Sequence, residues 1–481
     1  MSVRSRWRGR AAGAFWARRR SFIPVILEQS GPGNEKTMRV LVATVGGSGD
    51  INPFIAVGIA LRKRGHEVVL LVNPYFEQQV RDAGLEFAPL GDRFDFRRVA
   101  EVPELMHPRK AMRFVLEHYT LPLIPTTIDA MSSFIRDLRP DIVFSHHTCP
   151  GTHWVCERHG VPIAGAVLAP VVWPSCVDPS SILSWEPENP PGWYLRARVP
   201  IGRWLLRWII DRPFNRVRRR YGFPSKRDLF YADGLGGVVN LGLWSPHYRG
   251  RMSDDPPNGR ICGFPWFDRH GEFEQPSADV EEFLSDGEPP IVFTLGTSAV
   301  HLSGGFYACA AEACRILGHR GILLTRYPDY APRTLPPGVR AFTYVPFSSV
   351  LPRSVATVHH GGIGTTAQAM RAGRPTVIIP FAYDQFDNAA RAKRLGVSVT
   401  LRRNRLTPRA LADALRSVIN QPTVNDSAAR LGKLLSTEDG ALTAAMALED
   451  AVRGPTYRSA AQTKLQPRSS RRPTYTGSGA H

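Results

Sequence analysis

The chain has 481 residues, 43% of them hydrophobic and 10% aromatic, which predicts about two or three globular domains and excludes a disordered or fibrous protein. No window approaches the roughly 18 consecutive apolar residues of a transmembrane helix. Six cysteines show neither a C-x-x-C pair nor metal-ligand spacing with histidine, so we expect a reduced, cytoplasmic setting and no metal site.

The formal net charge of +19 is concentrated at the chain ends. Residues 1–37 hold eight basic and two acidic side chains, and residues 453–481 hold six basic and no acidic ones. Because both ends are rich in Arg, Ser, Gly and Pro, we expect disordered, solvated tails and no nucleic-acid partner. The twin-arginine stretch Arg18–Leu27 is too short for an export signal and is interrupted at Glu28. The fold is therefore predicted to begin at Met38.

From Met38 onward, buried strands alternate with helices. A strand over 39–45 leads into the turn "GGSGDINP", the helix "FIAVGIALRKRG" and the strand "HEVVLLVN", and further strands are predicted over 140–148 and 161–170. The Pro-, Gly- and Asp-rich stretches "SDDPPNGR" and "SDGEPP" then indicate a linker. A second series begins with "PIVFTLGTS" and continues through "TVIIPF" to a helix from about Phe386.

This alternation predicts an α/β protein with two facing, Rossmann-like, doubly wound domains, whose ligands lie at the carboxyl ends of the strands. Neither domain carries a complete G-x-G-x-x-G or P-loop motif, which argues against a dehydrogenase and a P-loop enzyme. The expected division is a basic extension (1–37), an N-terminal domain (38–250), a linker (251–289), a C-terminal domain (290–440) and a final helix end with a basic tail (441–481).

The stretch "HHGGIGTTAQAMRAGRP" combines two histidines with three glycines between a β-branched strand and a helix. At such a turn, free backbone N–H groups and the helix dipole favour an anion. Gly361, Gly362 and Gly364 would let the backbone approach a phosphate, and Thr365 would add a hydroxyl. A histidine at the strand end would donate to the same phosphate. A tight turn with a hydrogen-bonded histidine is the alternative interpretation.

Four segments together resemble the inverting nucleotide-sugar glycosyltransferases of family 1, which have the GT-B fold of two facing Rossmann-like domains. The resemblance spans roughly residues 38–440 and is nearest to the bacterial rhamnosyltransferase catalytic subunit and the sterol glucosyltransferase branch. It implies that the N-terminal domain binds the acceptor and the C-terminal domain binds the nucleotide sugar. The segments are "VATVGGSGDINPFIAVGIALRKRGHEV", "GFPWFD", "VFTLGTS" and "VHHGGIGTTAQAMRAGRPTVIIPFAYDQFDN".

The resemblance also implies a set of donor-binding residues and no cofactor besides the sugar nucleotide. The first histidine of the motif contacts the donor diphosphate, and neighbouring positions complete the phosphate cradle. An Asp-Gln pair binds sugar hydroxyls, and an upstream aromatic ring stacks on the base. In this sequence the diphosphate residues are His359, Gly361, Gly364, Thr365 and Thr297, the sugar residues are Asp384 and Gln385, and the stacking residue is Tyr344.

On the acceptor side the sequence departs from the plant members of the family. Asp50 stands where they have a catalytic histidine, as in the bacterial and sterol branches, and His146 lies near the place of their supporting aspartate. A helix N-cap is the alternative role for Asp50, and a buried, hydrogen-bonded residue is the alternative for His146. Ala367 replaces a ribose-binding glutamate, which favours a deoxyribose donor such as dTDP-rhamnose over UDP-glucose.

We therefore expect a metal-independent, inverting hexosyltransferase (EC 2.4.1 type) that uses dTDP-rhamnose or UDP-glucose. Asp50 would be the base, and His359 with the helix amino end at Gly364 would hold the leaving diphosphate. The acceptor would be a hydroxyl of a lipophilic molecule, such as a hydroxy-fatty acyl lipid, a sterol or a polyketide. A GT-B sugar-nucleotide epimerase and a non-catalytic sugar-nucleotide-binding protein stay open as alternatives.

The block "RWLLRWIIDRPFNRVRRRYGF", at 203–223, mixes Trp, Leu and Ile with many arginines in a helical pattern. Such a pattern is typical of a helix that lies on a membrane surface or covers a lipophilic site. A pair of N-terminal-domain helices with a solvated basic face is the alternative. The expected localisation is therefore cytoplasmic, with peripheral contact to the inner face of the membrane as an open extension.

Overall fold

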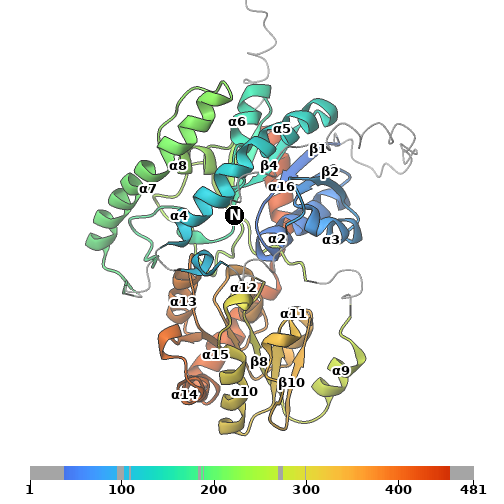
Figure 1. Cartoon of the computed structure of the whole chain (residues 1–481), viewed down its shortest axis with the longest axis vertical. Coiled ribbons are helices and arrows are strands. Elements are labelled where there is room, and N and C mark those ends of the chain that lie inside the picture. The colour runs from blue at the N-terminus through green and yellow to red at the C-terminus, as the bar shows by residue number, and fades with distance from the viewer. Residues whose placement is uncertain are drawn as a thin grey trace, which may run out of the picture.

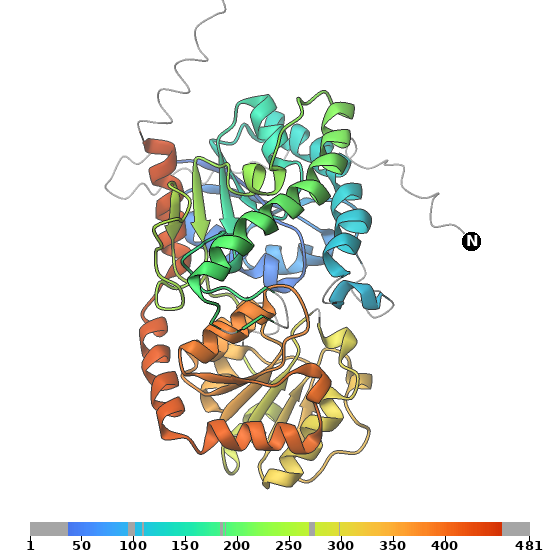
Figure 2. The same ribbon diagram turned by 90° about the vertical axis from the view of Figure 1, so that its left-hand side faces the viewer.

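The computed structural model describes residues 37–94, 102–107, 110–182, 186–187, 189–268, 275–297 and 299–454. It consists of two lobes, each built on one parallel β-sheet (Figures 1 and 2). The predicted pair of doubly wound α/β domains is confirmed. Except for Thr37 and residues 453–454, the two basic tails lie outside the described residues.

The N-terminal lobe holds a seven-stranded sheet with the order β3-β2-β1-β4-β5-β6-β7. Its strands are nearly all buried because helices cover both faces, as expected for a parallel sheet. The strands are β1 (Arg39–Ala43), β2 (Glu67–Val72), β3 (Glu86–Pro89), β4 (Ile142–His146), β5 (Ile163–Val167), β6 (Val239–Gly242) and β7 (Gly259–Ile261). The helices are α2 (Ser48–Lys63), α3 (Glu77–Asp82), α4 (Ala111–Val115), α5 (Leu121–Leu138), α6 (Thr152–His159), α7 (Gly192–Arg220) and α8 (Leu229–Gly234).

The C-terminal lobe holds a six-stranded sheet with the order β10-β9-β8-β11-β12-β13. The strands are β8 (Ile291–Thr294), β9 (Gly321–Leu324), β10 (Val339–Phe342), β11 (Ala356–His359), β12 (Thr376–Ile378) and β13 (Ser398–Thr400). The helices after the first lobe are α9 (Ala278–Ser285), α10 (Phe306–Leu317), α11 (Phe347–Val350), α12 (Ile363–Arg371), α13 (Gln385–Arg394), α14 (Pro408–Ile419), α15 (Pro422–Ser436) and α16 (Gly440–Arg453).

Each sheet has one point at which the strand order reverses. In the first sheet β1 lies beside β4, and in the second β8 lies beside β11. Ligands of doubly wound sheets bind in the crevice at the carboxyl ends of the strands at such a point. The "GGSGD" segment follows β1, and the "HHGG" segment begins at the end of β11. The two motifs that the sequence singles out thus occupy the two crevices.

Two features of the chain path were not foreseen. The expected linker, 251–289, contains the edge strand β7 and the helix α9. The last helix, α16, crosses back to the N-terminal lobe and joins its core with Ala444 and Leu448. There Glu449 pairs with Arg64 (2.5 Å) and His66 (2.8 Å).

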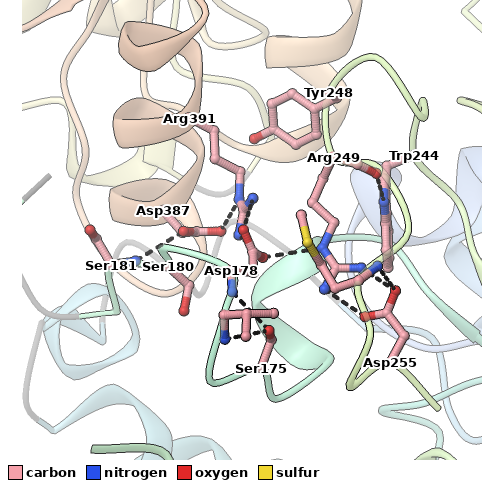
Figure 3. Close-up of polar contacts among 12 residues, drawn as sticks. Ser175, Asp178, Ser180, Ser181, Trp244, Tyr248, Arg249, Asp255, Asp387 and Arg391 are labelled. Carbon is pink, nitrogen blue, oxygen red and sulfur yellow. Dashed lines mark hydrogen bonds and ion pairs between the residues drawn. The ribbon is translucent and has the colours of Figure 1, made fainter. Parts of the chain in front are cut away.

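A buried ion-pair network joins the two lobes (Figure 3). Arg391 of α13 donates to Asp178 at 2.9 and 2.6 Å and to Asp387 at 2.7 Å. On the N-terminal side, Arg249 donates to Asp178 at 3.1 Å and to Asp255 at 2.6 Å. All five side chains are buried. Burial raises the pKa of Asp178, but the hydrogen bond and charge of Arg391, together with Arg249, outweigh it and hold that pKa below its ordinary value.

We predict that Asp178→Ala lowers the free energy of unfolding by about 3–5 kcal/mol, because two buried guanidinium groups each lose a carboxylate. Urea denaturation followed by tryptophan fluorescence measures the loss. Glu312→Ala is the control, since Glu312 forms an exposed pair with Arg315 at 2.6 Å and should cost about 1 kcal/mol or less. Equal, small losses in the two variants would contradict a stabilising role for the interlobe network.

Candidate active site

The "GGSGD" segment places the Asp50 carboxylate at the mouth of the first crevice. A turn was expected over "GGSGDINP", but α2 begins within it, at Ser48. Asp50 is therefore the third residue of the helix and not its N-cap. Its Oδ2 accepts a hydrogen bond from the backbone N–H of Gly47 at 2.9 Å. Gly46 has a φ of +122°, and a side chain there would overlap the Asp50 carboxylate, which explains this glycine.

The Asp50 carboxyl group is poised to gain and lose a proton near neutral pH. Burial raises its pKa to about 7, and the negative charge of Asp384 adds to the rise, while the Gly47 hydrogen bond opposes it. Asp384 belongs to the C-terminal lobe, so the charges of two carboxyl groups from different lobes interact at this site. An ordinary aspartate would be a weak base, whereas a pKa near neutrality suits general base catalysis.

His146 is the last residue of β4 and packs against α2, the helix that carries Asp50. Its ring is tilted against Phe54, one helical turn after Asp50, with 5.4 Å between the ring centroids. Its Nδ1 lies 2.8 Å from the hydroxyl of Thr148, and burial lowers its pKa well below the ordinary value, against the effect of a hydrogen bond with the Val45 backbone. The imidazole therefore already has two partners within the chain. This arrangement favours a supporting position for His146 over a direct acceptor contact.

The "HHGG" segment forms the turn from β11 into α12, as the sequence predicts. The helix begins after Gly362, which offers no side-chain cap. A hydrogen bond joins the Ile363 backbone to Asp384, so the next N–H groups, of Gly364 and Thr365, are those that an anion would meet. The space that a side chain at Gly364 would enter contains no other atom within 4 Å. At Gly361, in contrast, φ is +87° and the backbone of Gln385 approaches closely. The turn is thus packed on one side and open at Gly364, beside the Thr365 hydroxyl.

The two histidines of this turn are neutral and differ in their surroundings. His359 is fully buried, its Nδ1 accepts the Gly361 N–H at 3.1 Å, and its Nε2 is buried without a hydrogen-bond partner. The His360 ring lies between Gly296 and Gly362, and its Nδ1 also lacks a partner. Burial lowers the pKa of His359 to about 3 and that of His360 to about 4. Because Nδ1 of His359 accepts a hydrogen bond, its neutral ring carries the proton on the unpartnered Nε2, which is a donor at the end of β11.

The Asp384–Gln385 pair begins α13. Asp384 accepts a hydrogen bond from Asn388 at 2.8 Å, and burial raises its pKa to about 6. The Gln385 side-chain oxygen accepts the backbone N–H groups of Phe381 and Ala382 at 2.8 and 3.0 Å, so it fixes the loop before the helix. Asn388 also donates to the Gly361 carbonyl at 2.8 Å. The Asn388 amide therefore holds the Asp384 carboxylate beside the turn between β11 and α12.

Tyr383 is a site residue that the sequence did not reveal. It is a non-glycine residue with a φ of +57°, and its hydroxyl donates across the crevice to the Leu105 carbonyl. Burial raises its pKa, and the charge of Asp50 contributes to the rise, which places the phenol near that carboxylate. Strained backbone of this kind is concentrated at functional sites. The only sequence signal was its position directly before the Asp-Gln pair.

Tyr344, Thr297 and Ala367 are the remaining positions predicted on the nucleotide side of the site. The Tyr344 hydroxyl donates to the Asp268 carbonyl at 2.6 Å, and the guanidinium of Arg326 lies 5.7 Å from its ring centroid. Thr297 is half-buried in the turn after β8, next to the glycine that packs on His360. Ala367 lies on α12, and its side chain is buried among apolar residues.

Comparison with known proteins agrees with this architecture. Two family models match, the glycosyltransferase family 28 N-terminal domain over residues 40–172 and the erythromycin biosynthesis protein CIII-like C-terminal domain over residues 325–466. The chain is 31% identical over 439 residues to the O-mycaminosyltylonolide 6-deoxyallosyltransferase of Streptomyces fradiae, covering 86% of this chain and 97% of the relative.

Two further similarities are more distant. A sterol 3-beta-glucosyltransferase of Arabidopsis thaliana is 26% identical over 423 residues, with 84% of this chain and 66% of that protein covered. The solved structure of a spinosyn rhamnosyltransferase complexed with thymidine diphosphate superposes with a TM-score of 0.60 at 18% identity, covering 86% of this chain and 100% of that one.

The chain belongs to the GT-B glycosyltransferases that are related to macrolide glycosyltransferases and sterol glucosyltransferases. It is an enzyme of the hexosyltransferase type that uses a nucleotide-sugar donor. The family resemblance and the GT-B fold inferred from the sequence are confirmed. The roles of individual site residues stay predictions.

Gly364→Val tests whether the turn between β11 and α12 binds the sugar-nucleotide donor on its open side, at Gly364. The variant should fold normally, because the space beside Gly364 is empty, and should weaken donor binding about tenfold or more by covering the anion site. Gly202→Val on α7 is the matched control, since a side chain there also meets no atom within 4 Å. Calorimetric titration with a nucleoside diphosphate gives the affinities. Unchanged donor affinity in folded Gly364→Val would exclude this turn as the binding site.

Proposed function

We propose that the protein transfers a 6-deoxyhexosyl group, with inversion, from a thymidine diphosphate sugar to a hydroxyl of a lipophilic acceptor. The observation that carries the proposal is the half-buried Asp50 carboxyl, with its pKa raised to about 7, opposite Asp384 in the interlobe crevice. A base of this strength on one lobe and an anion-binding turn on the other are the two parts that such a transfer requires.

In the proposed reaction Asp50 accepts the proton of the acceptor hydroxyl while that oxygen bonds to C1 of the sugar. The bond from C1 to the diphosphate oxygen breaks on the opposite side, and the electron pair leaves with the nucleoside diphosphate. The N–H groups at the start of α12, with the neutral imidazole of His359, stabilise the developing charge. Asp384 and Gln385 hold sugar hydroxyls, and the crevice excludes water between the lobes.

The choice of donor rests on the ribose side of the site and on the relatives. Ala367 stands where related enzymes have a ribose-binding glutamate, so this position supplies no carboxylate for a 2′-hydroxyl. Its side chain packs in an apolar cluster. The relative from Streptomyces fradiae is a 6-deoxyallosyltransferase, and the spinosyn rhamnosyltransferase was solved with thymidine diphosphate. Rhamnose is therefore our representative donor sugar, ahead of UDP-glucose, although the related sterol enzyme is a glucosyltransferase.

The acceptor class follows from the same relatives, one of which acts on O-mycaminosyltylonolide and another on a sterol. We propose a polyketide-like or sterol-like alcohol, with a hydroxy-fatty acyl lipid as the further member of this class. Six free thiols support action in a reducing compartment, for which we propose the cytoplasm.

Incubating the enzyme with several sugar nucleotides and lipid extracts, followed by mass spectrometry, tests the reaction. Donor consumption that yields only an epimer or free sugar would contradict transfer.

Asp50→Asn should bind donor nearly as well as the parent enzyme but abolish transfer, because the carboxamide keeps the Gly47 hydrogen bond and accepts no proton. In the parent enzyme kcat/KM should rise with pH, with a midpoint near about 7, since only the ionised carboxylate acts as a base. Asp279→Asn, in the first turn of α9, is the control and should retain full activity. Normal turnover by a folded Asp50→Asn variant would place the base elsewhere.

The same raised pKa has a consequence for stability. The folded state holds the Asp50 proton more tightly than the unfolded chain does, so this group favours folding at low pH. That contribution is lost as the pH rises from 3.8 through about 7. Asp50→Asn should therefore be more stable than the parent at pH above this window, as thermal denaturation at several pH values would show.

The donor choice can be measured with pairs of nucleotides. Calorimetric titrations should show that dTDP-rhamnose binds at least as tightly as UDP-glucose. UDP and dUDP, which differ only by the 2′-hydroxyl, should bind with equal affinity. UDP-glucose binding tenfold tighter, which is about 1.4 kcal/mol, would overturn the proposed donor. A strong preference for UDP over dUDP would show that another residue recognises the 2′-hydroxyl.

A further inference from the structure

Helix α7 has apolar side chains on two opposite faces. It is a single helix of 29 residues, whereas a pair of helices was one of the alternatives predicted from the sequence. One face packs into the N-terminal lobe through Leu195, Leu206 and Ile210. The opposite face exposes Trp193, Ile201, Trp204, Leu205 and Trp208, with exposed fractions of 44–65%. At about 100° per residue these five residues form one stripe along the helix.

The exposed tryptophans are unusual within this protein. Trp154, Trp173 and Trp244 are almost completely buried, whereas Trp193, Trp204 and Trp208 are each more than 60% exposed. In Figure 1 α7 lies at the outer edge of the N-terminal lobe, and in Figure 2, which turns this side toward the viewer, no other described element lies in front of it. Clustered exposed aromatic side chains indicate an interaction surface.

The charge around the stripe indicates what it binds. The helix carries nine arginines, of which Arg198, Arg203 and Arg218 pair with acidic residues of the same lobe. Its one aspartate, Asp211, already accepts the backbone N–H groups of Asp228 and Leu229 at 2.8 and 2.9 Å. One turn after Trp208, Arg212 opens a basic pocket that continues the stripe. The pocket is lined by Arg212, Arg219, Lys226 and Arg227, with Asp211, Asn215 and Ser225 between them.

We propose that this face of α7 binds the surface of an anionic lipid bilayer. Tryptophan rings are favoured at the level of the lipid headgroups, and arginines beside them attract anionic phosphates. A second copy of the chain is disfavoured as the occupant, since it would bring the same arginines together. No described helix is long and apolar enough to cross a membrane, so the contact is peripheral. This binding does not depend on the glycosyl transfer.

Sedimentation with phospholipid vesicles tests the proposal on the full chain. The protein should bind vesicles with about 30% phosphatidylglycerol in phosphatidylcholine, and binding should weaken as NaCl rises from about 50 to about 500 mM. Replacing Trp193, Trp204 and Trp208 together by Ser should lower the partition coefficient about tenfold or more. The matched control replaces Leu434, Leu442 and Met446, exposed apolar residues on α15 and α16, by Ser and should bind normally.

A second measurement keeps the test valid if the triple variant folds poorly. Brominated phosphatidylcholine in the vesicles should quench the fluorescence of the parent protein, and Trp204→Phe with Trp208→Phe should reduce that quenching while preserving binding. Absence of binding to anionic vesicles would overturn the proposal. Equal binding by the triple serine variant would assign the membrane contact to another part of the chain. Loss of a dimer in sedimentation velocity, caused by the serine variant alone, would show that a second copy covers the stripe.

Discussion

The buried contact between Asp178 and Arg391 is the constraint on which the site depends. It joins side chains 213 residues apart, one from each lobe, at 2.6 Å. Arg391 lies on the helix whose first turn carries Asp384 and Gln385, and on the same helix Asn388 connects Asp384 with the Tyr248 hydroxyl of the N-terminal lobe at 2.9 Å. The ion pair and these hydrogen bonds therefore hold the Asp384 carboxylate in a fixed position relative to the N-terminal lobe.

This constraint explains why two carboxyl groups stay close together in one crevice. Burial raises the pKa of both carboxyl groups, and the charge of Asp384 adds to the rise at Asp50. In isolation neither lobe would place Asp384 near Asp50, so the pKa of Asp50 reports on the arrangement of the lobes.

Local patterns in the sequence predicted much of this structure. The alternating strands and helices indicated two parallel sheets, and the glycines of "GGSGD" and "HHGG" marked both crevices. Other features depend on contacts between distant residues, which leave no local pattern. Asp178 stands in an irregular segment, α16 packs on the opposite lobe, and Tyr383 owes its place to a strained turn. The sequence did not predict the start of α2 because its N-cap residue is Gly47, which has no capping side chain. The Asp50 carboxylate, three residues later, accepts the Gly47 N–H instead.

The most direct test of this account is the pKa of Asp50 itself. It can be followed by infrared or carbon-13 spectroscopy of aspartate-labelled protein, with Asp50→Asn assigning the signal. We predict a pKa of about 7 for Asp50 in the intact protein and a lower pKa in Asp384→Asn, which lacks the charge of Asp384. An Asp50 that titrates near 3.8, with no response to Asp384→Asn, would contradict the claim that the joined lobes create the catalytic base.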